Sequence, residues 1–119
     1  MKLKFLATFL AIYTGSAFCE ISYTGFSGNN LMDWSKIEKS PGGQVNTEDA
    51  LNNFLFYGYV AGVHDSGKMT KRFCSPPGVQ LPQLVAVVSK YLENDPKNWN
   101  MPAWYLTLKA FEEAWPCTE

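Results

Sequence analysis

The sequence predicts a small all-α domain of about four helices that is stapled by one disulfide, and three observations support this prediction. Apolar residues recur at helical spacing over residues 47–64, 82–94 and 103–114. Proline and glycine cluster between these segments, where helices are expected to end. Two cysteines, Cys74 and Cys117, bracket the last two segments. Because no repeat or linker interrupts residues 20–119, we expect them to form one domain.

The first 19 residues (1–19) have the pattern of a secretory signal peptide. Lys2 and Lys4 precede an apolar run, and small residues follow this run. The run is too short to span a bilayer as a helix, so no membrane attachment is expected after cleavage. Cleavage is predicted after Ala17 or after Cys19, and only the second cut removes the third cysteine from the mature chain.

Export to an oxidising compartment allows Cys74 and Cys117 to form a disulfide. Chain-entropy arguments give such a bridge about 4 kcal/mol. Removal of Lys2 and Lys4 with the signal makes the balance of 10 basic and 11 acidic residues more acidic. Phosphate binding needs a basic face, so no nucleic-acid partner is expected. A hydrophobic content of 46% is sufficient for a folded core.

The first helix is predicted over residues 30–39, after an extended segment at 20–30. A Pro-Gly-Gly turn within residues 40–43 ends it. Its apolar stripe consists of Leu31, Trp34 and Ile37.

The second predicted helix has a clear start. Asn46 or Thr47 can cap its N-terminus, and the acids at positions 48 and 49 suit the helix dipole. The helix is predicted to end at about His64, before a polar loop over residues 65–72.

One face of this helix is predicted to be a packing face, formed by Leu51, Leu55, Gly58 and Gly62. Each glycine costs a helix about 1 kcal/mol relative to alanine. Close approach of a neighbouring helix would offset that cost, so Gly58, Tyr59 and Gly62 are predicted to serve helix packing. A ligand groove over the bare backbone is the alternative interpretation.

The last two helices are predicted to begin at prolines, which suit the first turn of a helix. One begins at Pro82 and is stopped by Asn94-Asp95-Pro96. Its apolar stripe consists of Leu84, Val85, Val88, Tyr91 and Leu92. The other follows Pro102 and covers residues 103–114, and its predicted buried residues are Leu106, Ala110, Phe111 and Ala114.

The sequence argues against an enzyme. The single histidine, His64, falls at the predicted end of a helix, where it would complement the dipole. Cysteines in a disulfide are neither nucleophiles nor metal ligands. Zinc-ligand spacing, a glycine-rich phosphate loop and a nucleophile elbow are all missing from the sequence. We therefore expect no catalytic residue, no metal and no cofactor.

Several sequence pieces occur together in one order: Gly58-Tyr59-Val60-Ala61-Gly62-Val63-His64-Asp65, Phe73-Cys74-Ser75-Pro76-Pro77-Gly78-Val79, the segment 83–92, and Ala114-Trp115-Pro116-Cys117. In this order and spacing they resemble the Rap1a/Tai immunity protein family. The weaker match of residues 27–33 to the family's first helix extends the resemblance towards the N-terminus.

The resemblance implies a small periplasmic all-helical protein that is commonly a homodimer. Proteins of this family protect a bacterium from the peptidoglycan amidase effectors of type VI secretion systems, by occupying the active-site cleft of the effector. A shared Tyr–Gly–Gly–Asp segment corresponds to Tyr59, Gly62 and Asp65 here. The C-terminal cysteine pair corresponds to Cys74 and Cys117.

Two polar loops are candidate partner-binding segments. The first offers Asp65, Lys68, Lys71 and Arg72, and the second offers Asp95, Asn98 and Trp99. Tryptophan is enriched at interface hot spots, so Trp99 is the expected anchor. The alternative is that both loops are ordinary solvated loops, with Trp99 packed on the core. A chaperone-like or stress-response protein that binds unfolded clients is the alternative function.

Overall fold

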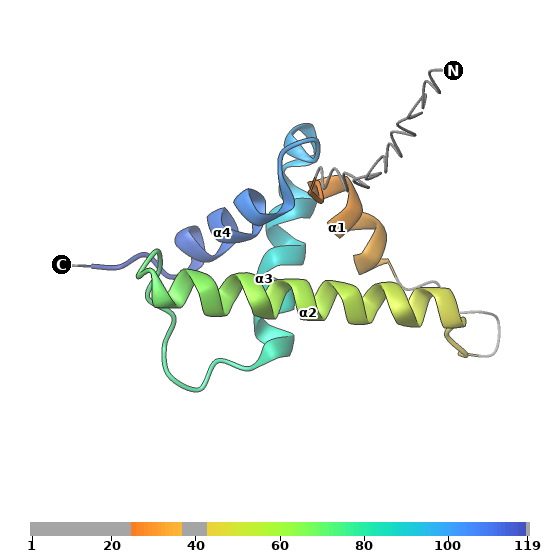
Figure 1. Ribbon diagram of the computed structural model, residues 1–119, viewed down its shortest axis with the longest axis horizontal. Helices are drawn as coiled ribbons and strands as arrows, with labels where there is room; N and C mark the ends of the chain where they lie inside the picture. The colour runs from red at the N-terminus through yellow and green to blue at the C-terminus, as the bar shows by residue number, and fades with distance from the viewer. Residues whose placement is uncertain (1–24, 37–42, 119) are drawn as a thin grey trace, which may run out of the picture.

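The computed structural model describes residues 25–36 and 43–118, and these form an all-α domain (Figure 1). The elements are α1 (Gly28–Ser35), α2 (Thr47–Met69), α3 (Leu81–Asn94), the short 3-10 helix η1 (Pro96–Asn98) and α4 (Ala103–Ala114). The predicted fold class is confirmed. The predicted signal peptide and Ile37 lie outside the described residues.

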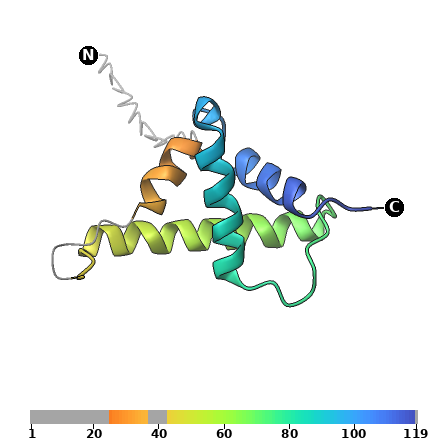
Figure 2. The ribbon, with the colours of Figure 1, turned by 180° about the vertical axis from the view of Figure 1, so that it is seen from behind.

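The long helix α2 is the base on which the other helices assemble. Figures 1 and 2 show α1 and α4 along the same edge of α2, while α3 crosses it. Every pair of the four helices is in contact. The side chains at the centre of this arrangement are fully or almost fully buried, and the largest are Phe56, Phe111, Leu31, Leu92 and Leu106.

Helix α1 begins at Gly28, earlier than the predicted start at Asn30. The side chain of Asn30 accepts a hydrogen bond from the backbone N–H of Ser27 at 2.9 Å, which fixes the first turn. Gly28 donates its N–H to the carbonyl of Met101 at 3.0 Å. A Cβ at position 28 would lie 2.9 Å from the Cα of Trp99, so this contact requires glycine.

Helix α2 begins as predicted, because the side chain of Asn46 accepts a hydrogen bond from the backbone N–H of Asp49 at 2.8 Å. Its predicted end was wrong. The helix continues past His64 to Met69, where the N–H of Thr70 bonds to the carbonyl of Ser66. Asp65 and Lys68 therefore lie on the helix and not in a loop.

The predicted packing face of α2 was also wrong. Leu51 is 60% exposed and Leu55 is 53% exposed. The buried face of the helix consists instead of Phe56, Val60, His64 and Gly67. Both stripes have helical spacing, so the spacing alone does not show which of them is buried.

Helices α3 and α4 confirm the prediction at nearly every position. Pro82 lies in the first turn of α3, and α4 follows Pro102. Residues 84, 85, 88 and 92 of α3 are buried, as are 106, 110 and 111 of α4. Two positions differ: Tyr91 of α3 is only partly buried, and Ala114 lies exposed at the last position of α4.

The disulfide between Cys74 and Cys117 is formed, with 4.9 Å between the two Cα atoms. Beside it, the N–H of Cys74 donates to the carbonyl of Trp115 at 2.8 Å. The bridge therefore joins the α2–α3 connection to the end of α4. Within residues 25–36 and 43–118, no helix combines the length and apolar character needed to cross a membrane.

Candidate partner-binding surfaces

His64 is a buried core residue, which corrects its predicted place at a helix end. Its side chain lies 5.2 Å from the ring of Phe73 and 5.4 Å from that of Phe111, measured between centroids. Its Nε2 lies 3.1 Å from the hydroxyl oxygen of Ser75. The part of the chain that the structure describes contains no cluster of three or more His, Cys, Asp or Glu side chains suited to a metal.

The first group of predicted partner-binding residues lies at the C-terminal end of α2. Asp65 and Lys68 are exposed on the helix, and Lys71 and Arg72 follow in the turn after it. Lys71 has a positive φ of 54°. Its N–H donates to the carbonyl of Lys68 at 3.2 Å, which keeps the turn tight.

Arg72 is already paired within the chain. Its Nε and Nη2 donate to Oε1 of Glu112 at 2.9 Å and 2.6 Å, and Lys109 lies 3.3 Å from Oε2 of the same carboxylate. The hydrogen bond from Arg72 is the main cause that lowers the pKa of Glu112 below its usual value of 4.5. The positive charge of Arg72 is therefore offset by Glu112, so Lys68 and Lys71 are the stronger candidates for contact with an acidic partner at this end of α2.

The connection over residues 70–80 bows away from the helices in both views (Figures 1 and 2). Three features hold its backbone. The disulfide fixes Cys74, Pro76 and Pro77 each fix a φ angle, and Gly78 takes the positive φ of 82° at the turn. This projecting loop is therefore restrained at its base and along its length.

The second group of predicted residues is tied to the body of the domain. Asp95 accepts a hydrogen bond from the side chain of Asn98 at 2.7 Å. Trp99 is partly buried, and its indole N–H donates to the carbonyl of Leu92 at 2.7 Å. The carbonyl of Trp99 accepts the N–H of Asn29 at 2.8 Å. The interpretation of Trp99 as an exposed anchor was wrong, and the alternative of packing on the core is correct.

The structure does not bring the two groups onto one surface. The second group precedes the start of α4, whereas the first lies near its end, beside Cys117. A helix of 12 residues separates them by about 18 Å along its axis. A single partner contact centred on one group would not include the other.

The exposed face of α2 contains two of the three predicted helix-packing residues. Apart from the neighbouring residues and backbone of α2 itself, no atom of the described chain lies within 4 Å of a Cβ built on Gly58 or Gly62. The predicted approach of a neighbouring helix therefore does not occur inside this chain. Tyr59 is partly buried, with its ring 6.0 Å from that of Phe26 and 6.1 Å from that of Trp34.

A shallow groove of about 340 Å³ runs beside Gly62, between α2 and α4. Ser66 and Gly62 form its α2 side, and Trp104 and Leu108 form its α4 side. Trp104 is 52% exposed, and the sequence analysis did not select it. Its position outside the buried stripe of α4 (103, 106, 107, 110 and 111) is a signal that could have found it.

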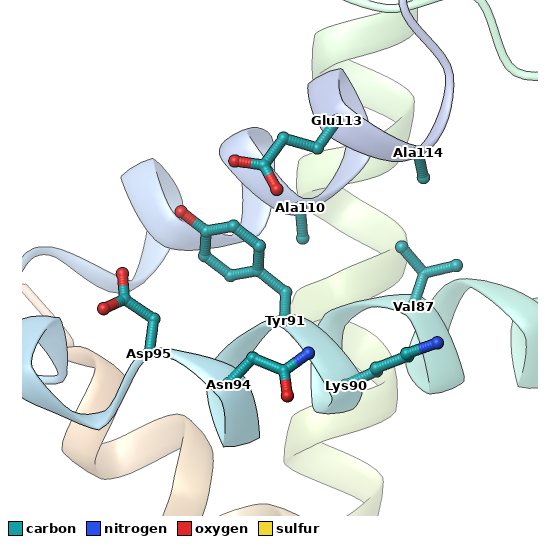
Figure 3. Close-up of a pocket in the computed structure, with 8 residues that line it drawn as sticks. All are labelled: Val87, Lys90, Tyr91, Asn94, Asp95, Ala110, Glu113 and Ala114. Atoms are coloured by element: carbon teal, nitrogen blue, oxygen red, sulfur yellow. The ribbon is translucent and has the colours of Figure 1, made fainter.

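A second cavity of about 540 Å³ lies between α3 and α4 (Figure 3). Figure 3 shows Tyr91 of α3 between the carboxylates of Glu113 and Asp95, and Val87 of α3 and Ala110 of α4 also line the cavity. Burial is the largest cause that raises the pKa of Tyr91, followed by the charges of Glu113 and Asp95. The sequence analysis missed this cavity, because helical spacing does not show which side chains of two helices meet.

The sequence profile of the family described as Rap1a immunity proteins matches residues 27–117. The chain belongs to the Rap1a immunity protein family. Rap1a immunity proteins are inhibitors and not enzymes, and they bind a partner effector. A comparison with curated proteins and one with solved structures found no match.

In this Rap1a chain, Tyr59, Gly62 and Asp65 lie on different faces of α2. Tyr59 packs towards α1, whereas Gly62 and Asp65 face solvent. The structure of this segment therefore combines a core contact with an open helix face. The exposed face of α2 and the projecting loop 70–80 are candidate surfaces for a partner.

Proposed function

We propose that this chain is a periplasmic immunity protein that inhibits one peptidoglycan amidase effector of a type VI secretion system. Inhibition occurs by occlusion of the amidase active site. Membership of the Rap1a family supports the immunity role. The disulfide between Cys74 and Cys117 suits an oxidising compartment such as the periplasm, which agrees with the predicted export signal.

The observation that carries this proposal is the restrained projecting loop 70–80. Occlusion of a cleft needs a segment that protrudes and keeps its shape, and it needs no catalytic group. A loop held in its bound conformation loses less conformational entropy on binding than a free loop does. The disulfide, the two prolines and the bond from Cys74 to Trp115 supply that restraint.

The charges beside the loop predict the charge of the amidase surface that it meets. Lys68 and Lys71 are exposed at its base, while the charge of Arg72 is offset by Glu112. We expect the rim of the amidase cleft to be acidic where it meets these lysines. Such rim charges act mainly on the association rate and on its dependence on salt.

A chaperone-like protein remains the alternative function, because α2 exposes large apolar side chains. Phe54 is 74% exposed and Met69 is 85% exposed. A chaperone would bind many unfolded clients weakly through such a surface, whereas an immunity protein binds one folded enzyme tightly.

The proposal is tested by capture on the full-length oxidised protein from a lysate of its own organism, with mass spectrometry and a peptidoglycan hydrolysis assay. We expect one stoichiometric amidase that is inhibited while bound. The charge reversal Lys71→Glu should weaken inhibition about tenfold. The same reversal at exposed Lys97, in η1, is the matched control and should leave inhibition unchanged. A spread of unrelated substoichiometric clients would favour the chaperone function instead.

A further inference from the structure

The cavity between α3 and α4 is open because α4 presents two alanines there. Ala110 and Ala114 line it together with Val87 and Tyr91 of α3. The alanine side chains are too short to fill the space between the helices, and a volume of about 540 Å³ remains. This volume falls within the range of small-molecule sites, about 300–1,000 Å³. Loop 70–80 does not line the cavity, so the cavity has no part in the proposed inhibition.

The charged groups of the cavity are divided between two ends. Figure 3 shows the carboxylates of Asp95 and Glu113 on the side of the Tyr91 hydroxyl. The ammonium group of Lys90 lies on the opposite side of the Tyr91 ring. The helical rise separates Lys90 from Asp95 by about 7.5 Å along the axis of α3. The cavity therefore has an acidic end and a basic end.

The charges at these ends remain available to a ligand. Among the described residues, neither Lys90 nor Glu113 has a side-chain hydrogen bond or an ion pair, although both line the same cavity. Asp95 accepts a hydrogen bond from Asn98 on Oδ2 at 2.7 Å, which holds the carboxylate in place. Its other oxygen can accept a further bond. Each end can therefore bind a group of the opposite charge.

The ring of Tyr91 stands between the two ends and suits the middle of a ligand. Burial, and then the charges of Glu113 and Asp95, raise the pKa of Tyr91, so its hydroxyl is uncharged at neutral pH. The face of a neutral phenol ring attracts an ammonium group that lies within about 6 Å of the ring centroid. Val87 and Ala110 add apolar surface that an aliphatic chain can cover.

We propose that this cavity binds an ω-amino acid, a short aliphatic chain with an ammonium group at one end and a carboxylate at the other. The ammonium group lies between Asp95 and Glu113, and the carboxylate pairs with Lys90. In extended 6-aminohexanoate the two charged ends are about 7 Å apart, because each bond of about 1.5 Å advances the zigzag chain by about 1.25 Å. This span matches the rise between Lys90 and Asp95, whereas the two charges of a simple α-amino acid are too close together to reach both ends.

The proposal is tested by NMR titration of the full-length oxidised protein with 6-aminohexanoate, hexylammonium and hexanoate. The three probes share a six-carbon chain and differ in their charged ends. With 6-aminohexanoate we expect saturable shifts of the backbone amide signals of residues 87–95 and 110–114. Hexylammonium and hexanoate should each bind at least about tenfold more weakly, because each lacks one charged end. The absence of saturable shifts, or equal affinity for all three probes, overturns the proposal.

Two substitutions assign the two ends of the cavity. Lys90→Gln should reduce the preference for 6-aminohexanoate over hexylammonium, and Glu113→Gln should reduce its preference over hexanoate. Both side chains are exposed, so neither change disturbs the core. The matched controls are Lys97→Gln and Glu93→Gln, at exposed positions outside the cavity, which should leave both preferences unchanged. Preferences that ignore Lys90→Gln and Glu113→Gln, or that change equally in the controls, contradict the proposal. No amidase is present, so the result is independent of the proposed function.

Discussion

Two glycines of α2 have opposite surroundings, and this contrast predicts opposite effects of the same substitution. A Cβ at Gly67 would lie 2.5 Å from Cε1 of Phe73 and 2.8 Å from Cδ2 of Leu108. A Cβ at Gly62 would meet no atom of the described chain within 4 Å beyond its own turns of α2. Gly67→Ala therefore crowds the core, whereas Gly62→Ala adds a methyl group to an open surface.

The magnitude follows from two terms. Alanine in place of glycine favours the helix by about 1 kcal/mol at either position. At Gly67, overpacking opposes this gain by about 1–3 kcal/mol, since the ring of Phe73 is only 2% exposed and packs 5.1 Å from that of Phe111. The helix term is shared, so the difference between the two variants measures the packing cost, which we expect to be about 1–3 kcal/mol.

The assay is urea unfolding of both variants and the unsubstituted chain in dilute solution, followed by circular dichroism. Gly62→Ala should raise the free energy of unfolding, and Gly67→Ala should lower it relative to Gly62→Ala by the packing cost. Equal stabilisation by both substitutions would refute the reasoning, because it would mean that Gly67 is not packed against Phe73 and Leu108.

Two further predictions concern the covalent and ionic links of the fold. Replacing both Cys74 and Cys117 with serine should lower the free energy of unfolding by about 4 kcal/mol, because the bridge closes a separation of 43 residues; urea unfolding with an unchanged midpoint would contradict this. The lowered pKa of Glu112 means that its bond to Arg72 adds stability above about pH 4.5, and that this stability is lost as the pH falls through the lowered pKa. Urea midpoints of the unsubstituted chain and of Glu112→Gln should therefore converge between pH 7 and pH 3, and a constant difference would exclude this role.

The sequence predicted the helices best where local chemistry marks their ends. Pro82 and Pro102 set the starts of α3 and α4, and Asn46 capped α2 as expected. These signals are local, because a missing N–H or a capping side chain acts within one turn. The disulfide between Cys74 and Cys117 was also predicted, because these two cysteines bracket the last two helices and the predicted export signal implies an oxidising compartment.

Long-range packing decided what the sequence did not show. Gly67 looked like a loop residue, but its missing side chain makes room for Phe73 and Leu108 inside a continuing helix. The choice between the two apolar stripes of α2 depended on which one α1, α3 and α4 cover. In the same way, Trp99 and Trp104 are the same residue type, and the sequence does not show that Trp99 packs on the core and bonds to the end of α3 while Trp104 is half exposed.

The central claim is that this chain inhibits one peptidoglycan amidase by occlusion, and a titration tests it most directly. The amidase captured by the full-length oxidised protein would be assayed for peptidoglycan hydrolysis against increasing amounts of that protein. The account predicts that hydrolysis falls to zero at a fixed stoichiometry, and that soluble substrate and inhibitor compete for the enzyme. An amidase that binds the protein but keeps its full rate of hydrolysis would contradict the account.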